Sequence, residues 1–274
     1  LKVPNKEIIK KPVIIEDNVS FINQTANYGA TILAGGNSLS LNAVKSLKIG
    51  NNAYFYNNDA YNGNIMVMGY VVSTPTGYDY STTVEIGNNA RFINNTANGW
   101  GGAAIRAEGV KLLDIGSDLY ISGNSATGNG GAGIFASNVK TIKIGNNAQI
   151  VNSTYQQGAL LKAQSFETVE IGDNLILKNN TSNGQGGGVT VLTGKSLAIG
   201  DNFTVENNTQ SSGGGAGIYA SGVDSITVGE DAVFRNNTAN GMGGAGINAT
   251  GFDTLEIGKN AVFANNIATG GGGS

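Results

Sequence analysis

Carboxylate side chains recur at one position of a repeated segment, and carboxylates are the groups in this chain most able to bind a cation. Asp173, Asp201 and Glu230 are spaced by 28 and 29 residues, and Asp231 follows the last of them. Three carboxylates stacked about 5 Å apart could hold a cation such as calcium. Other copies have asparagine there, at Asn51, Asn88 and Asn146. Aspartate and asparagine both favour turns, so we favour a column of turn residues and predict neither a metal site nor a cofactor.

Glycine-rich segments are the second candidate for calcium binding. Residues 214–219 read Gly-Gly-Ala-Gly-Ile-Tyr, whereas calcium-binding nonapeptide repeats read Gly-Gly-x-Gly-x-Asp. Tyr219 stands where the metal-binding aspartate would be, and Phe135 and Asn248 stand there in other copies. The period of the repeat is also about three times too long. These segments therefore predict tight corners of the backbone, which glycine permits, rather than calcium ligands.

Catalytic chemistry has few candidates in this chain. It has no histidine and no cysteine, which excludes Ser-His-Asp catalysis, histidine-metal sites and disulfides. Arginine occurs at three positions only, Arg91, Arg106 and Arg235. Lys143, Glu170 and Glu256 share one outward position of the repeat, which is typical of a solvated face. Cleavage of a polysaccharide needs paired carboxylates, and the sequence singles out no pair, so we predict no enzymatic activity and keep glycan cleavage as an alternative.

Exposed aromatic side chains are the remaining candidates, through contacts with proteins or sugars. Residues 59–83 contain an insertion in the repeat, which we expect to form a tyrosine-rich loop. Its tyrosines are Tyr61, Tyr70, Tyr78 and Tyr80. Trp100 lies at a glycine corner where other copies have unrelated residue types, so we expect it to be exposed. These five residues are the predicted binding site; the alternative is that Tyr70 and Tyr78 pack the loop against the fold.

Nine copies of one segment must position these residues. Successive copies are mostly 27 to 29 residues apart, and two longer gaps measure 34 and 37 residues. Each copy has a branched aliphatic residue, at Ile15, Ile49, Ile86, Ile115, Ile144, Ile171, Ile199, Val228 and Ile257. Six positions later comes a large apolar residue, such as Phe55, Phe92, Phe234 or Phe263. Self-similarity at such a period predicts stacked units that share one core.

Polar residues complete each copy. Three positions after the large apolar residue lies an asparagine in most copies, and six copies continue with threonine, at Thr25, Thr96, Thr154, Thr181, Thr209 and Thr238. Flat ice-binding faces show two threonine columns, whereas the repeat shows one. We therefore expect a turn column whose hydroxyls bond to nearby backbone.

Apolar residues alternate with polar ones in each copy, as in Val84-Glu85-Ile86. Period two predicts strands with one buried face, and frequent Gly-Gly pairs disfavour helices. Three short strands in about 29 residues, separated by Asn- and Gly-rich turns, predict one turn of a parallel β-helix. The expected fold is an all-β, single-stranded parallel β-helix solenoid of about nine rungs of 27–37 residues, right-handed by the usual rule for parallel connections.

Two recurring motifs, Phe-x-x-Asn and Gly-Gly-Ala-x-Ile, resemble the repeats of the chlamydial-type polymorphic outer-membrane proteins. The first motif occurs at Phe55–Asn58, Phe92–Asn95, Phe234–Asn237 and Phe263–Asn266, and with an aliphatic residue in place of Phe before Asn124, Asn180 and Asn208. The second occurs at Gly102–Ala103, Gly131–Ala132, Gly215–Ala216 and Gly244–Ala245. The chain lacks the cysteines common in those proteins, so a related autotransporter from another bacterium fits equally well.

The resemblance covers nearly the whole chain, and it implies a β-helical passenger fragment of an autotransporter over residues 1–274. Such a fragment would lie at the bacterial cell surface, on the extracellular side of the outer membrane, or be secreted. It would act in virulence as an adhesin that binds a host cell-surface protein or glycan. Its anchoring would need a translocator domain outside this chain. A polysaccharide-cleaving β-helix enzyme and a passive spacer are the alternatives.

Composition narrows these functions further. The formal net charge is −3 and no basic patch occurs, so we predict no nucleic-acid binding. The sequence has no run of about 18 apolar residues, so we predict no membrane-spanning helix. The tail Gly270–Ser274 either continues the ninth repeat or is a linker. Open strand edges at an end of the solenoid predict self-association.

Overall fold

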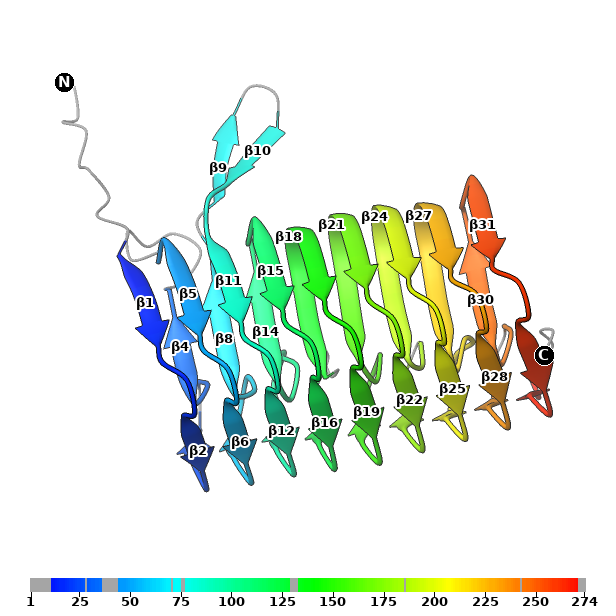
Figure 1. The fold of residues 1–274 in the computed structure, drawn as a ribbon, viewed down its shortest axis with the longest axis horizontal. Coiled ribbons are helices and arrows are strands. Elements are labelled where there is room, and N and C mark those ends of the chain that lie inside the picture. The colour runs from blue at the N-terminus through cyan, green and yellow to red at the C-terminus, as the bar shows by residue number, and fades with distance from the viewer. Residues whose placement is uncertain are drawn as a thin grey trace.

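Alternating apolar residues form strands in every copy of the repeat, and these strands stack along one axis. The structure, a computed structural model, describes residues 11–27, 29–35, 44–69, 71–74, 77–128, 133–184, 186–241 and 243–270. Parallel strands lie side by side in rows along the length of the molecule, with the first strands (blue) and the last strands (red) at opposite ends of the rows (Figure 1). The secondary structure of the described residues is all strand, and the predicted class, a parallel β-solenoid, is confirmed.

Three parallel sheets, here named A, B and C, form the walls of the solenoid. Sheet A has 13 strands: β1 (Pro12–Ile15), β4 (Ile32–Ala34), β5 (Ser46–Ile49), β8 (Ile65–Met68), β11 (Thr83–Ile86), β14 (Ile105–Glu108), β15 (Leu112–Ile115), β18 (Ile134–Ile144), β21 (Leu161–Ile171), β24 (Val189–Ile199), β27 (Ile218–Val228), β30 (Ile247–Thr250) and β31 (Thr254–Ile257). From β18 to β27 each sheet A strand is 11 residues long, whereas the first and last rungs divide it into two shorter strands.

Sheets B and C each take one short strand from every copy. Sheet B has nine strands: β2 (Ser20–Ile22), β6 (Tyr54–Tyr56), β12 (Arg91–Ile93), β16 (Tyr120–Ser122), β19 (Gln149–Val151), β22 (Ile176–Lys178), β25 (Thr204–Glu206), β28 (Val233–Arg235) and β32 (Val262–Ala264). Sheet C has nine strands: β3 (Thr25–Ala26), β7 (Asp59–Ala60), β13 (Thr96–Ala97), β17 (Ser125–Ala126), β20 (Thr154–Tyr155), β23 (Thr181–Ser182), β26 (Thr209–Gln210), β29 (Thr238–Ala239) and β33 (Ile267–Ala268). One set of strands from A, B and C makes one rung.

The core is built from columns of equivalent apolar side chains. Phe55 pairs in register with Phe92, both are fully buried, and their ring centroids lie 4.7 Å apart in a stacked arrangement. Phe234 stacks on Phe263 at the same distance. A strict register is expected because a slip of one residue would turn the apolar face outward.

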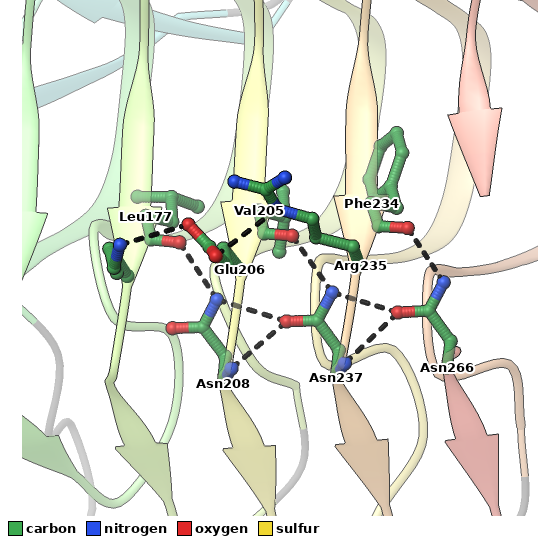
Figure 2. Close-up of polar contacts among 9 residues, drawn as sticks. Leu177, Val205, Glu206, Asn208, Phe234, Arg235, Asn237 and Asn266 are labelled. Carbon is green, nitrogen blue, oxygen red and sulfur yellow. Dashed lines mark hydrogen bonds and ion pairs between the residues drawn. The ribbon is translucent and has the colours of Figure 1, made fainter. Parts of the chain in front are cut away.

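Buried asparagines join the rungs at the turn between sheets B and C. The Asn208 amide nitrogen donates to the Leu177 carbonyl at 2.8 Å and to the Asn237 amide oxygen at 3.2 Å (Figure 2). The Asn237 oxygen also accepts the backbone N–H of Asn208 at 2.9 Å, and Asn266 repeats the pattern one rung further. This column satisfies backbone groups that the turn removes from the sheets, which is the usual requirement for buried polar groups.

An ion-pair network lies outside the same turn. The Glu206 carboxylate pairs with Arg235 Nε of the next rung at 3.1 Å (Figure 2). It also pairs with Lys178 Nζ of the preceding rung at 3.0 Å. Its pKa is lowered, first by the hydrogen bond from Lys178 and then by that from Arg235. The three side chains are therefore a surface ladder that follows the rung spacing.

The insertion at 59–83 is mostly regular structure. Residues 59–60 and 65–68 continue the solenoid as β7 and β8, in register with their neighbours. The part that leaves the rung is an antiparallel hairpin, β9 (Val71–Thr74) and β10 (Gly77–Tyr80), which stands away from the stacked strands (Figure 1). Tyr70 lies outside the described residues.

Candidate functional site

Tyr61 and Trp100 lie at one corner of the solenoid, on neighbouring rungs. Tyr61 follows β7, and its carbonyl accepts the backbone N–H of Gly99 at 2.7 Å. A Cβ atom at Gly99 would lie 2.6 Å from Cδ1 and Cε1 of the Tyr61 ring, so glycine allows the ring to lie against the next rung. Tyr61 is 39 % exposed and Trp100 is 58 % exposed. The corner therefore presents two aromatic side chains to solvent.

A hydrogen-bonded charge pair lies beside this corner. Asn62 directly follows Tyr61, and its amide oxygen accepts a hydrogen bond from Arg106 Nη1 at 2.6 Å. Arg106 also donates through Nε to Glu108 Oε1 at 2.8 Å. Because Glu108 neutralises it, Arg106 braces the corner and is not a free anion-binding group. Sequence reasoning missed Asn62 and Arg106, although Asn62 adjoins a predicted residue and arginine is rare in the chain.

The other predicted aromatic residues lie elsewhere. Tyr61 precedes β8, whereas the hairpin follows the opposite end of that strand. Tyr80 lies at the base of the hairpin, with Lys140 Nζ 5.5 Å from its ring centroid. Tyr78 belongs to β10, but its side chain is outside the described part of the structure. The structure thus brings together Tyr61 and Trp100, and it separates Tyr80 from them.

The described motif residues taken from the family resemblance form the core and its turns. Asn58, Asn95, Asn124, Asn180, Asn208 and Asn237 are buried, as are Phe55, Phe92 and Phe234. Phe263 is 47 % exposed because it lies in the last described rung. Gly102 and Ala103 are buried at the glycine corner, and Gly131 and Ala132 lie outside the described residues. These residues therefore have a structural place in the core and at its corners.

The carboxylate column makes backbone contacts between rungs. Asp173 Oδ1 accepts the N–H of Asp201 at 3.0 Å, and Asp201 Oδ1 accepts the N–H of Glu230 at 2.7 Å. Asn146 makes the equivalent bond to Asp173 at 2.9 Å. Within the described residues no group of three or more acidic side chains is arranged to hold a metal ion. This geometry supports turn residues, because Asp and Asn make the same bond.

Charged residues do line a shallow groove along sheet A. Glu85 and Asp114 are register partners on β11 and β15, and both line a hollow of about 430 Å³. Asp114 also borders a second hollow of about 370 Å³ together with Lys143 and Glu170. Lys143 Nζ lies 2.8 Å from Glu170, and this hydrogen bond raises the pKa of the lysine. Register pairing puts the Glu85 and Asp114 backbones about 4.8 Å apart, so the two residues are neighbours on the same face of sheet A.

Two further titratable groups are perturbed, and both lie within the fold. Burial lowers the pKa of Lys162, whose Nζ lies 5.5 Å from the ring centroid of Phe135. Burial raises the pKa of Tyr155, which occupies a core position held by alanine in the neighbouring rung. Perturbed pKa values accompany structural burial as well as catalysis, and neither residue lines a described hollow.

Comparison with known proteins assigns no family. No family model matches this chain, and neither a curated protein nor a solved structure is significantly similar to it. Among the described residues, no helix has the length and apolar character needed to cross a membrane.

Proposed function

We propose that this chain is a non-catalytic binding rod, the passenger fragment of an autotransporter that acts as a bacterial surface adhesin. The observation that carries the proposal is the exposed pair Tyr61 and Trp100 on a corner braced by Arg106. Exposed aromatic residues on a rigid support are favourable contact residues, because little side-chain entropy is lost on binding. The partner would be a host cell-surface protein or glycan.

The stacked rungs suggest how such a rod binds. Each rung advances by the strand spacing of about 4.8 Å, so equivalent side chains recur at a fixed interval along the molecule. When several weak contact sites lie on one rigid chain, binding at one site raises the effective concentration of the others near the partner. The overall affinity then exceeds that of any single site. The proposed location is the extracellular side of the outer membrane, with anchoring by a translocator domain, or the medium after secretion.

Attachment of protein-coated beads to cultured epithelial cells tests this proposal. Beads coated with the chain should attach saturably, compared with beads coated with an inert protein. Trp100→Ala should reduce attachment several-fold, because it removes the most exposed aromatic side chain at the corner. Phe252→Ala is the matched control, since Phe252 is 40 % exposed but lies in the last rung, and it should have no effect. Attachment no greater than that of inert beads would refute the adhesin and leave a passive spacer or glycan cleavage.

Glycan cleavage is the second candidate, favoured by the pairing of Glu85 with Asp114 in the sheet A groove. Retaining glycosidases use two carboxyl groups about 5–5.5 Å apart, one as acid/base and one as nucleophile. Incubation with polysaccharides should then release reducing ends, and both Glu85→Gln and Asp114→Asn should abolish the release. Product formation that survives both substitutions would exclude this pair.

A further inference from the structure

The outward face of sheet C is almost free of charge. Two side-chain columns form it, because the residue between them in each strand points into the core. The first column is threonine or serine from Thr96 to Thr238, preceded by Asp59 and followed by Ile267. The second lies two residues later in each rung and contains only asparagine, threonine, glutamine and serine from Asn98 to Thr269. Asp59 is the one charged residue in the described part of both columns.

Sheets A and B show that the fold does not require an uncharged face. Their outward positions carry Lys48, Glu85, Asp114, Lys143, Glu170 and Glu256 on sheet A. Sheet B carries Arg91, Lys178, Glu206 and Arg235 at outward positions. All three sheets share the same rungs and the same solvent. Stability alone therefore does not explain why charge is nearly absent from sheet C.

The two columns offer hydrogen-bonding groups at rung spacing. Thr181 pairs in register with Thr209, and Thr209 with Thr238, so their hydroxyls recur about every 4.8 Å. Neighbouring members of the second column bond to each other, as Thr127 Oγ1 does to Asn98 Oδ1 at 3.1 Å. Hydroxyl and amide groups both donate and accept hydrogen bonds. The face is thus a regular array of neutral donors and acceptors.

An aromatic platform continues this array. Tyr61 belongs to the second column itself, one rung before Asn98, and Trp100 lies two residues after Asn98. Both aromatic side chains are exposed, whereas the residue between the columns, such as Ala97, is buried. The platform and the neutral columns therefore form one continuous surface.

We propose that this surface, sheet C with the Tyr61–Trp100 corner, binds an uncharged polysaccharide laid along the solenoid axis. This inference rests on the binding function proposed above and names its partner class. The hydroxyl groups of a neutral polymer can replace the hydrogen bonds that water makes to hydroxyl and amide side chains. They cannot offset the larger free-energy cost of removing water from a charged side chain. The apolar face of a sugar ring packs against an aromatic ring, which gives Trp100 and Tyr61 their role.

Ice is the other extended array of neutral hydrogen-bonding groups. The second column varies among asparagine, glutamine, serine and threonine, and the Thr127–Asn98 bond joins two of its members, so these side chains do not form a uniform threonine lattice. An exposed tryptophan beside the columns adds nothing to ice contact. A polysaccharide accommodates both features.

Depletion of the whole 274-residue chain by insoluble polysaccharides tests the proposal. Cellulose, chitin and a β-1,3-glucan are the neutral probes, and cross-linked polygalacturonic acid is the acidic one. At least one neutral probe should bind saturably, and the acidic probe should bind at least about tenfold more weakly. Thr209→Lys should weaken neutral binding by about tenfold, because a charge would be desolvated in the middle of the track. Thr204→Lys is the control, since Thr204 faces outward from sheet B in the same rung.

Three outcomes would overturn the inference. The first is that the chain binds none of the neutral probes, and the second is that Thr209→Lys and Thr204→Lys weaken binding equally. The third is a thermal hysteresis that identifies ice as the ligand. Unchanged melting temperatures of both variants exclude misfolding as the cause of lost binding. If coated beads still attach to cells while all neutral probes fail, the adhesin proposal stands and this inference falls. If beads also fail, both fall.

Discussion

Replacing Asn208 by alanine removes one member of the buried asparagine column without touching the apolar core. The Asn208 side chain is 3 % exposed. Its oxygen accepts the backbone N–H of Asn180 at 2.9 Å. Its nitrogen donates to the Leu177 carbonyl at 2.8 Å (Figure 2). Alanine can make neither bond. Neighbouring amides keep other partners, since Asn180 Nδ2 still donates to the Ile150 carbonyl at 2.8 Å.

The expected loss follows from these two bonds. The Asn180 N–H is left buried without a partner, which costs about 1–3 kcal/mol, and the lost bond to Leu177 adds about 1 kcal/mol. We therefore expect Asn208→Ala to lower the free energy of unfolding by about 3 kcal/mol. Asn146→Ala is the matched control, because Asn146 Oδ1 also accepts a backbone N–H from the next rung, that of Asp173, at 2.9 Å. That site is exposed, so water replaces the amide and the loss should stay below about 1 kcal/mol.

Urea denaturation followed by circular dichroism measures both variants against the parent chain. Solenoids do not always unfold in one step, so the comparison should use midpoints of transitions with equal slopes. The reasoning is refuted if Asn208→Ala costs less than 1 kcal/mol, or if the buried and exposed substitutions cost the same. A small cost would mean that water reaches the Asn180 N–H inside the turn, and equal costs would mean that burial does not set the loss.

Three further predictions use other parts of the rod. The ion pairs of Glu206 lower its pKa, so they stabilise the fold above the pKa of the unfolded chain, and this stabilisation is lost as the pH falls through the folded pKa. The decrease of the urea midpoint in acid should therefore be smaller in Glu206→Gln than in the parent chain. A Cβ atom at Gly194 would lie 2.2 Å from Cζ of Phe166. Gly194→Val should therefore lower the free energy of unfolding by about 1–3 kcal/mol, seen as a lower urea midpoint. An unchanged midpoint would contradict the packing. Phe263 is 47 % exposed while Phe234 is fully buried, so light scattering should show concentration-dependent oligomers that Phe263→Lys reduces; monomer at high concentration would refute this.

The sequence predicted the rungs because every copy repeats the same constraint. Alternation at Val84 and Ile86, the large apolar residue at Phe92 and the buried Asn95 recur in fixed order, so an error in one copy is corrected by the others. Val84, Ile86 and Phe92 are buried as expected, and Asn95 is buried although its burial was not predicted. The hairpin β9–β10 has no second copy to align with, and its turn residues alone did not distinguish a hairpin from an irregular loop. The same limit hid the brace at Arg106, because that outward column holds a different residue type in each rung.

The neutral columns of sheet C needed the register as well as the sequence. Threonine recurs visibly in the first column, but Asn98, Thr127 and Gln156 of the second share no residue type. What they share is the absence of charge on one face, and that property appears only when the rungs are stacked. A sequence search for identical residues at one period therefore finds the folding motif and overlooks a surface defined by a shared property.

The buried asparagine column and the sheet C face are adjacent along the chain, and this links stability to the proposed binding. Asn95 directly precedes Thr96, and Asn208 directly precedes Thr209. Each asparagine oxygen accepts the backbone N–H of its equivalent in the preceding rung. These buried hydrogen bonds set the distance between rungs and therefore between the outward threonines. A rigid, evenly spaced array loses little entropy when it meets a regular polymer, and this lowers the cost of binding. Outward side chains can then change without loss of spacing, because the groups that set the spacing are buried.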